Sequence, residues 1–176
     1  TVGILVDKKN LIRDLTYNWI YMQEPGVNVG RIQVFNNWSP YLVKNKNTIW
    51  LGLEFFCKEG DNLWSMKDKE LINLSMKELQ QIDLINNENI SDSIVVRVPK
   101  AYPGYFGKSF KNFKLLQQEI NKVKNLFLIG RNGMHRYNNQ DHSMLTAKAA
   151  ADQIINNDID KSKIWNINID DEYHEE

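Results

Sequence analysis

The chain has 176 residues, with 22 basic and 22 acidic side chains and a formal net charge of +0. Its hydrophobic content of 42% and charged content of 25% are typical of a folded domain, so disorder is excluded outside the ends. Charge neutrality and the lack of a long basic patch argue against nucleic acid as a partner. No apolar run reaches the roughly 18 residues of a membrane-spanning helix, so no membrane partner is expected either.

Cysteine usage bounds the chemistry further. Cys57 stands alone, which excludes an intramolecular disulfide and a cysteine-based zinc site. This usage fits a reducing compartment, so a cytoplasmic protein is expected. Because Cys57 ends an apolar run, we expect it to be a small buried residue. The chain opens on Thr1 and enters an apolar run at once, so we expect it to be a piece of a longer protein.

The first hundred residues favour β-strands, because runs of aromatic and β-branched residues alternate with Asn, Gly, Asp and Pro clusters. The run at 48–57 is apolar on both faces, which is typical of a central strand covered on one side by helices and on the other by a domain or ligand. We therefore expect a mainly antiparallel sheet with flanking helices. The predicted strands are 2–6, 18–23, 30–35, 48–57 and 93–98.

Apolar residues at helical spacing predict three helices. The first follows a Ser-x-x-Asp capping box that begins at Ser65. Between the second and third helices, the apolar run 125–130 predicts a short buried strand, and this order of elements is an α/β unit. The helices are expected over 65–82, from Ser109 to Val123, and from about Asn139 to Ile155.

The densest polar cluster spans 130–143, between the predicted last strand and the third helix. Ligands of open α/β sheets bind beyond the carboxyl ends of strands, where a helix N-terminus favours anions. The glycines permit close backbone approach and the arginines can donate forked hydrogen bonds to phosphate or carboxylate. A solvated loop capped by Asn139 or Asp141 fits the residue types equally well. The glycines are Gly130 and Gly133, and the arginines are Arg131 and Arg136.

Three other features allow more than one interpretation. His135, His142 and Asp141 share no helical or strand face, so no metal site is expected. Arg97 interrupts an apolar run, where a charge is costly unless it meets a phosphate, carboxylate or cofactor, or lies at an exposed edge. The tryptophans fit either a carbohydrate-binding platform or the core of the sheet, and the core is the simpler interpretation. These tryptophans are Trp19, Trp38, Trp50 and Trp64.

The block 126–147 closely resembles the C-terminal flavin-binding segment of a family of FAD-dependent oxidoreductases. That family is related to UDP-galactopyranose mutase and, more distantly, to protoporphyrinogen oxidase and amine oxidases. The resemblance continues upstream into blocks that look like the family's substrate domain, and it covers nearly the whole chain up to about Ile155. The upstream blocks are 30–33, 37–40, 51–56, 60–65 and 96–103.

The resemblance implies an α+β fold with three parts. Residues 1–124 would form a substrate-binding-type domain with a mainly antiparallel sheet. Residues 125–156 would supply the last strand, loop and helix of an FAD-binding α/β domain, and 157–176 would be a polar acidic tail. The Gly-x-Gly-x-x-Gly turn that receives the pyrophosphate does not occur in this sequence, so an N-terminal dinucleotide-binding domain is an expected partner.

The resemblance also implies site residues. Gly130 and Arg131 would lie by the ribityl–pyrophosphate, and amides near Gln140, Asp141 and His142 would face the pyrimidine edge of the flavin. A helix N-terminus favours the negative charge of a reduced flavin there. Asn139 replaces an Asp of the mutase pattern, so the resemblance fits a related substrate as well as it fits the substrate of the mutase. The implied substrate-binding residues are Arg97, Tyr102, Tyr105, Tyr137 and Asn139.

The implied function is that of an FAD-dependent oxidoreductase, with redox or flavin-N5 chemistry on a nucleotide-sugar or glycan-related substrate in the intact enzyme. NAD(P)H is a candidate reductant. No catalytic acid, base or nucleophile is nominated, because the flavin carries the chemistry. The alternative is a non-catalytic protein- or carbohydrate-binding module that has lost flavin binding. Alone, the 176 residues are expected to be inactive and to hold FAD weakly.

Overall fold

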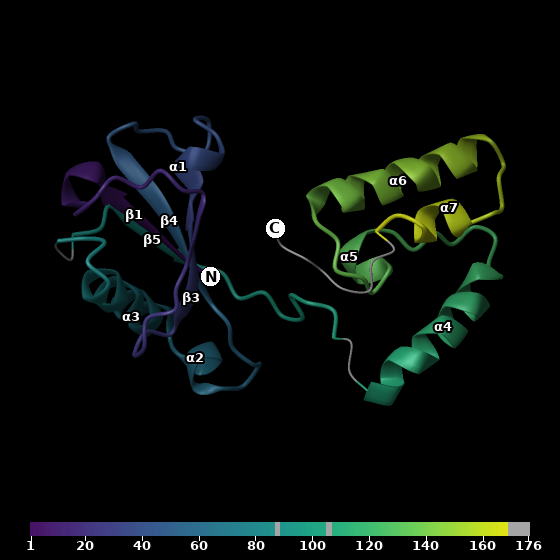
Figure 1. Ribbon diagram of the computed structural model, residues 1–176, viewed down its shortest axis with the longest axis horizontal. Helices are drawn as coiled ribbons and strands as arrows, with labels where there is room; N and C mark the ends of the chain where they lie inside the picture. Colours follow the sequence, from purple (N-terminus) through teal and green to yellow (C-terminus); the bar gives the residue numbers. More distant parts are fainter. Residues whose placement is uncertain (87–88, 105–106, 169–176) are drawn as a thin grey trace. The chain divides into compact units, whose positions relative to one another are not determined.

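The computed structural model describes residues 1–86, 89–104 and 107–168, with only the backbone described at 107–111. The chain divides into two compact units, Thr1–Pro99 and Lys100–Glu176 (Figure 1). This division differs from the boundary expected after residue 124, because helix α4 (Gly107–Asn121) belongs to the second unit. Within the described ranges, no helix is long and apolar enough to cross a membrane.

The first unit is built on a five-stranded sheet with the strand order β2-β3-β4-β1-β5. Every neighbouring pair is antiparallel, which confirms the expected sheet type. All five predicted strands form, and β4 is the central strand, as its two apolar faces predicted. The strands are β1 (Val2–Asp7), β2 (Trp19–Tyr21), β3 (Val29–Val34), β4 (Thr48–Phe55) and β5 (Asp92–Val95).

One face of this sheet forms the main core with helix α3 (Asp68–Gln81). Alternate strand residues such as Ile4, Ile32 and Leu51 are fully buried there, together with Leu79 of the helix. This burial follows from the two-residue period of strands and the helical spacing of apolar residues in α3. Shorter helices complete the unit: η1 (Lys8–Asn10), α1 (Phe35–Trp38) and α2 (Asn62–Ser65).

The predicted capping box at Ser65 is wrong. Ser65 ends α2, whose N-cap is Asp61; this carboxylate accepts the N–H of Trp64 at 2.8 Å. That hydrogen bond is the main reason why the pKa of Asp61 lies below its ordinary value. At the start of α3, the Glu70 carboxylate instead accepts the N–H of Lys67 at 3.0 Å. The expected helix is therefore α3, which begins at Asp68, and a separate short helix with its own cap precedes it.

The buried carboxylate of Glu78 ties α3 to the start of β3. Oε1 of Glu78 accepts the backbone N–H of Asn28 at 2.8 Å and its side-chain amide at 2.7 Å. Oε2 accepts the N–H of Val29 at 2.9 Å. Three donors offset the cost of removing this carboxylate from water, and they fix the start of β3 on the helix.

The second unit is helical among its described residues. Helix α4 begins at Gly107, ahead of the expected start at Ser109, and helix α6 (Gln140–Ile155) confirms the predicted third helix. The segment 125–129 is not assigned as a strand, although Ile129 is extended at φ −131° and ψ 157°. A strand requires a hydrogen-bonded neighbour, and the described residues provide none. The remaining helices are α5 (Gly130–Gly133) and α7 (Ser162–Trp165).

The prediction of a tail from residue 157 is wrong over 157–168. Ile164 and Trp165 of α7 are buried, and they pack with Met134 and Ala150 in a second core. The buried ammonium of Lys161 donates to the carbonyls of Val123 at 2.5 Å and Leu126 at 2.7 Å. The polar residues that suggested a tail therefore attach this segment to the end of α4. Residues 169–176 lie outside the described residues.

Removing the Glu78 carboxylate should destabilise the first unit. Glu78→Ala leaves three donors unpaired, so the free energy of unfolding should fall by about 3 kcal/mol. Lys77, the exposed neighbour of Glu78, is a matched control, and Lys77→Ala should change the free energy of unfolding by no more than about 0.5 kcal/mol. Urea unfolding of both variants measures the difference; equal small effects would contradict the role given to Glu78.

Acid should release α7. The pKa values of Asp158 and Asp160 lie below 3.8, chiefly because of the backbone N–H groups of Asp160 and Ser162 that hydrogen-bond them. The folded state thus favours the ionised carboxylates, and their contribution is complete above pH 3.8 and lost as the pH falls through the lowered values.

The indole N–H of Trp165 reports this change, because it donates to the Asn121 side chain at 3.0 Å. Its NMR resonance should move in acid, while that of Trp50 in the first unit should not follow the same curve. In Asp160→Asn the pH dependence should shrink. An unchanged titration of the Trp165 resonance in this variant would show that Asp160 does not hold α7.

Candidate functional site

The turn after the extended segment is built around Gly130, whose φ of +69° lies in the region that favours glycine. The Gly130 N–H donates to the hydroxyl of Thr146 at 3.1 Å. Thr146 is fully buried in α6, and its hydroxyl donates to the Ser143 carbonyl at 2.8 Å. The α5 turn is therefore pinned to the beginning of α6.

The N-terminus of α6 lies beside this turn. Asn139 is the N-cap residue, and its N–H donates to Nδ1 of His142 at 3.3 Å. The side chains of Gln140 and Asp141 are exposed, and His142 is half-buried. Asn139 and His142 form a capping box in which the Asn139 side chain bonds the N–H of His142. This end of α6 therefore offers a ligand its positive dipole end and the N–H groups that the capping box does not use.

The guanidinium of Arg131 is held by its own unit. Nε donates to the Asn138 carbonyl at 3.0 Å and Nη1 to the Ala101 carbonyl at 3.2 Å. The cation lies 4.3 Å from the ring centre of Tyr137 and 5.6 Å from that of Tyr102, and these rings are stacked at 5.5 Å. Three predicted site residues thus form one cluster, the Arg131–tyrosine stack. Phosphate binding by Arg131 stays a prediction.

The second arginine of the loop has a different role from the one expected. Nη1 of Arg136 donates to the carbonyls of Trp165 at 3.2 Å and Asn168 at 2.6 Å. The Asn168 side chain donates in turn to the carbonyl of Tyr137 at 2.7 Å and to Oδ1 of Asn138 at 2.9 Å. Arg136 therefore bonds carbonyl groups of its own chain and fixes residues 165–168 against the loop, while anion binding by Arg136 stays a prediction.

Arg97 lies in the first unit, just beyond β5. It donates to the carbonyls of Trp64 at 3.0 Å and Met66 at 2.5 Å, and to the Asp68 carboxylate at 2.6 Å. The partner that a charge requires at this position is thus the carboxylate of Asp68, and Arg97 fixes the connection between α2 and α3. Substrate binding by Arg97 stays a prediction, and Tyr105 lies outside the described residues.

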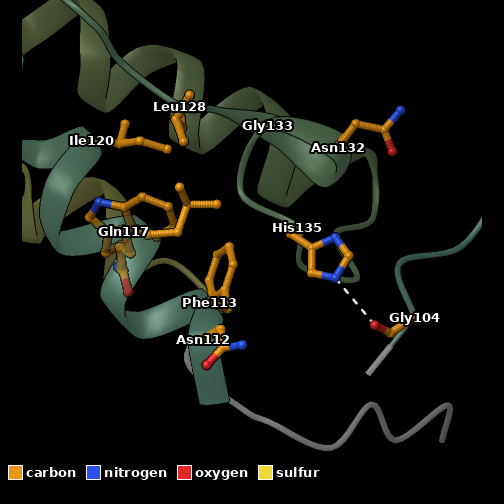
Figure 2. A pocket seen from close by; sticks show the side chains of 11 residues that line it. Gly104, Asn112, Phe113, Gln117, Ile120, Leu128, Asn132, Gly133 and His135 are labelled. Atoms are coloured by element: carbon orange, nitrogen blue, oxygen red, sulfur yellow. Dashed lines mark hydrogen bonds between the residues drawn. The ribbon is translucent and has the colours of Figure 1, made fainter. Parts of the chain in front are cut away.

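A cavity of about 450 Å³ opens within the second unit, between α4 and the α5 turn. Figure 2 shows Ile120, Leu128 and Phe113 along its apolar side and the His135 ring beside that of Phe113, with 5.6 Å between the ring centres. Nε2 of His135 lies 3.2 Å from the Gly104 carbonyl oxygen, and its backbone has an uncommon φ of +47°. Sequence reasoning considered His135 only as a metal ligand. The sequence signal that could have placed His135 beside a cavity was its position in a dense polar loop.

The residues around Gly130 fit one edge of an anionic cofactor such as FAD. A Cβ atom placed on Gly130 would meet only Ser143, at 3.8–3.9 Å, so the turn is open to a close neighbour. The N-terminus of α6 supplies donors and positive potential beside it. The described ranges contain no group of three His, Cys, Asp or Glu side chains that could hold a metal ion.

Cys57 is exposed beyond the end of β4, so its predicted burial is wrong.

Fold and site together define a mixed α/β chain, with a five-stranded antiparallel sheet and a glycine turn that leads into a helix N-terminus. The chain matches no family model and no curated protein. Among solved structures it is similar to reduced UDP-galactopyranose mutase, with a TM-score of 0.75 and 24% identity over 94% of this chain. The chain covers 35% of that mutase chain, so it has the fold of part of a larger protein.

The two glycines of the turn give a matched pair of variants. Gly130→Ala puts a side chain at φ +69° and should lower the stability of the second unit by about 1 kcal/mol. Gly133→Ala makes only ordinary contacts, at 3.6 Å from the Leu128 backbone, and should leave stability unchanged or raise it slightly. Thermal unfolding of both variants tests this order. Equal effects would contradict the requirement for glycine at position 130.

Proposed function

We propose that this chain is the C-terminal part of an FAD-dependent oxidoreductase that acts on a nucleotide-sugar or glycan-related substrate. The observation that carries the proposal is the order of elements at 125–155: an extended segment that pairs with no strand among the described residues, a glycine turn and a helix N-terminus. The likeness to part of a reduced mutase supports it, as does the sequence resemblance of the block 126–147.

The second unit has the surface of an incomplete α/β domain. Leu126 and Ile129 of the extended segment are exposed, and so are Met144 and Leu145 of α6. A single extended segment cannot satisfy its own backbone groups, and a parallel sheet buries both of its faces. On our proposal, an N-terminal dinucleotide-binding domain supplies the strands that pair with 126–129 and covers these apolar side chains.

Each part of the site has a task in this proposal. FAD would supply the redox or flavin-N5 chemistry when bound. The N-terminus of α6, at Gln140 to His142, would favour negative charge at the pyrimidine edge, and Gly130 would let the backbone approach the ribityl chain. The Arg131–tyrosine stack would position Tyr137 on the substrate side. NAD(P)H is the proposed reductant and the cytoplasm the proposed location.

FAD binding by the longer protein tests this function. The longer protein should purify yellow, with flavin absorbance in the visible blue, or take up added FAD. A colourless protein that takes up no FAD would contradict the proposal and favour a binding module without flavin chemistry.

Glycine variants of the longer protein locate the site. Gly130→Ala should weaken FAD binding roughly tenfold, equivalent to about 1.4 kcal/mol, because the shifted turn misplaces the backbone. Gly60 is a matched control: it also has a positive φ, of +88°, with no atom within 4 Å of an added Cβ, and it lies in the first unit. Fluorescence titration of FAD should detect weakening in Gly130→Ala alone. Equal weakening in Gly60→Ala would show that the loss is not local.

A further inference from the structure

A loop at one end of the first unit's sheet exposes apolar side chains. The loop 35–47 connects β3 to β4 and contains α1 (Figure 1). Tyr41 is 95% exposed, Leu42 is 54% exposed and Trp38 is 46% exposed. Single exposed apolar residues are common on protein surfaces, but these three lie within five consecutive residues of one loop. The loop therefore presents aromatic and aliphatic surface to the solvent.

Buried contacts hold this loop in a defined place. Val43 is buried, and the Thr48 hydroxyl closes the following turn by donating to the Asn45 carbonyl at 2.8 Å. At the start of the loop, the side-chain amide of Asn36 donates to the Thr48 carbonyl at 2.9 Å. Because both ends and the middle of the loop are anchored, its exposed apolar side chains are displayed by an ordered segment.

Four exposed lysines accompany the apolar side chains, and they come from two segments that are distant in the chain. Lys44 and Lys46 belong to the loop itself. Lys8 and Lys9 belong to η1, which lies beside the loop, since the backbone N–H of Lys8 donates to the Asn47 carbonyl at 2.8 Å. The sequence shows no long basic run because the fold, and not the order of residues, brings these two pairs together.

These lysines give this end of the sheet a positive charge. The Lys9 ammonium lies 3.6 Å from the Asp7 carboxylate, and the Lys9 side chain is 79% exposed. Among the described residues, Lys8, Lys44 and Lys46 form no ion pair. The apolar loop thus lies among cations that a partner can neutralise. We call this surface the basic loop surface, and it consists of Lys8, Lys9, Trp38, Tyr41, Leu42, Lys44 and Lys46.

An anionic lipid bilayer is the partner that matches both properties of this surface. Tyrosine and leucine side chains enter the headgroup region, and lysines beside them attract acidic headgroups. A nucleic acid would match the lysines but would leave the Leu42 side chain in water. An uncharged apolar protein surface would cover Tyr41 and Leu42 but would leave the lysines without counter-charges.

We propose that the basic loop surface docks on an anionic phospholipid bilayer, with Tyr41 and Leu42 inserted at headgroup level and the lysines against acidic headgroups. The expectation of no membrane partner concerned a spanning helix, which a peripheral contact does not need. The cytoplasmic leaflet carries acidic lipids, in agreement with the proposed location. The inference does not rest on flavin binding, because none of these residues belongs to the Gly130 turn or to α6.

Vesicle co-sedimentation of the 176-residue chain tests the proposal. The chain should bind vesicles of equal parts phosphatidylcholine and phosphatidylserine, and it should not bind pure phosphatidylcholine. The double variant Tyr41→Ala, Leu42→Ala should bind about tenfold more weakly, because it loses the inserted apolar surface. Lys44→Gln should weaken binding about fivefold, because one cation is lost near the bilayer.

Two variants of the second unit are matched controls. Ile155→Ala removes an apolar side chain that is 76% exposed, and Lys124→Gln removes an exposed lysine. Both should bind the phosphatidylserine vesicles as the parent chain does.

No binding to the phosphatidylserine vesicles would overturn the proposal, and so would equal binding to pure phosphatidylcholine or equal weakening in the two controls. The longer protein should bind the same vesicles. Loss of that binding in the longer protein would show that another domain covers the basic loop surface, which would also overturn the proposal. Vesicle binding by a longer protein that takes up no FAD would support the basic loop surface and contradict only the proposed flavin function.

Discussion

An extended backbone needs a hydrogen-bonding neighbour, and the segment 126–129 has no strand partner among the residues that the structure describes. The elements that follow it depend on this segment. Gly130 turns the chain out of this segment, and the Thr146 hydroxyl holds that turn against α6. The ammonium of Lys161 donates to the carbonyl of Leu126, the first residue of the segment. The described part of the second unit is therefore ordered by contacts of its own, and on the proposed function this segment is the strand that pairs with a sheet of another domain.

The first unit pairs its five strands within a single sheet, in contrast to the unpaired segment of the second unit. Glu78 and the buried residues of α3 complete the core on one face. The other face keeps a paired arginine and carboxylate beneath open rings. On the proposed function, the second unit would supply the cofactor contacts at Gly130 and at the N-terminus of α6, and it would also supply Tyr137 on the substrate side.

Local patterns in the sequence predicted the elements, whereas partners distant in the chain decided the site. Alternation within 48–57 predicted the central strand, and helical spacing predicted α4 and α6, because both signals are contained in a short window. The cap at Ser65 failed because Asp61 begins a short helix ahead of it, and Ser65 is the last residue of that helix. The expected strand at 125–130 failed because strand pairing is a non-local property.

Side-chain partners were the least predictable feature. The residue types of Arg131 and Arg136 predicted anion binding, which stays a prediction, but they gave no sign of the carbonyl groups up to 32 residues away that hold these side chains. The polar composition after residue 157 concealed a packed turn, since Trp165 and Lys161 find partners on α4 and beyond its end. The pairing of Arg31 with Glu54 depends on the register of β3 and β4, which the sequence pattern alone does not determine.

Amide hydrogen exchange at Phe127, Leu128 and Ile129 tests most directly whether 126–129 is a strand completed by another domain. Pairing with a sheet protects such amides, whereas an unpaired segment exchanges quickly. The account predicts fast exchange at these three amides in the 176-residue chain and slow exchange in the longer protein. Fast exchange in both proteins would contradict it, and so would protection already complete in the shorter chain.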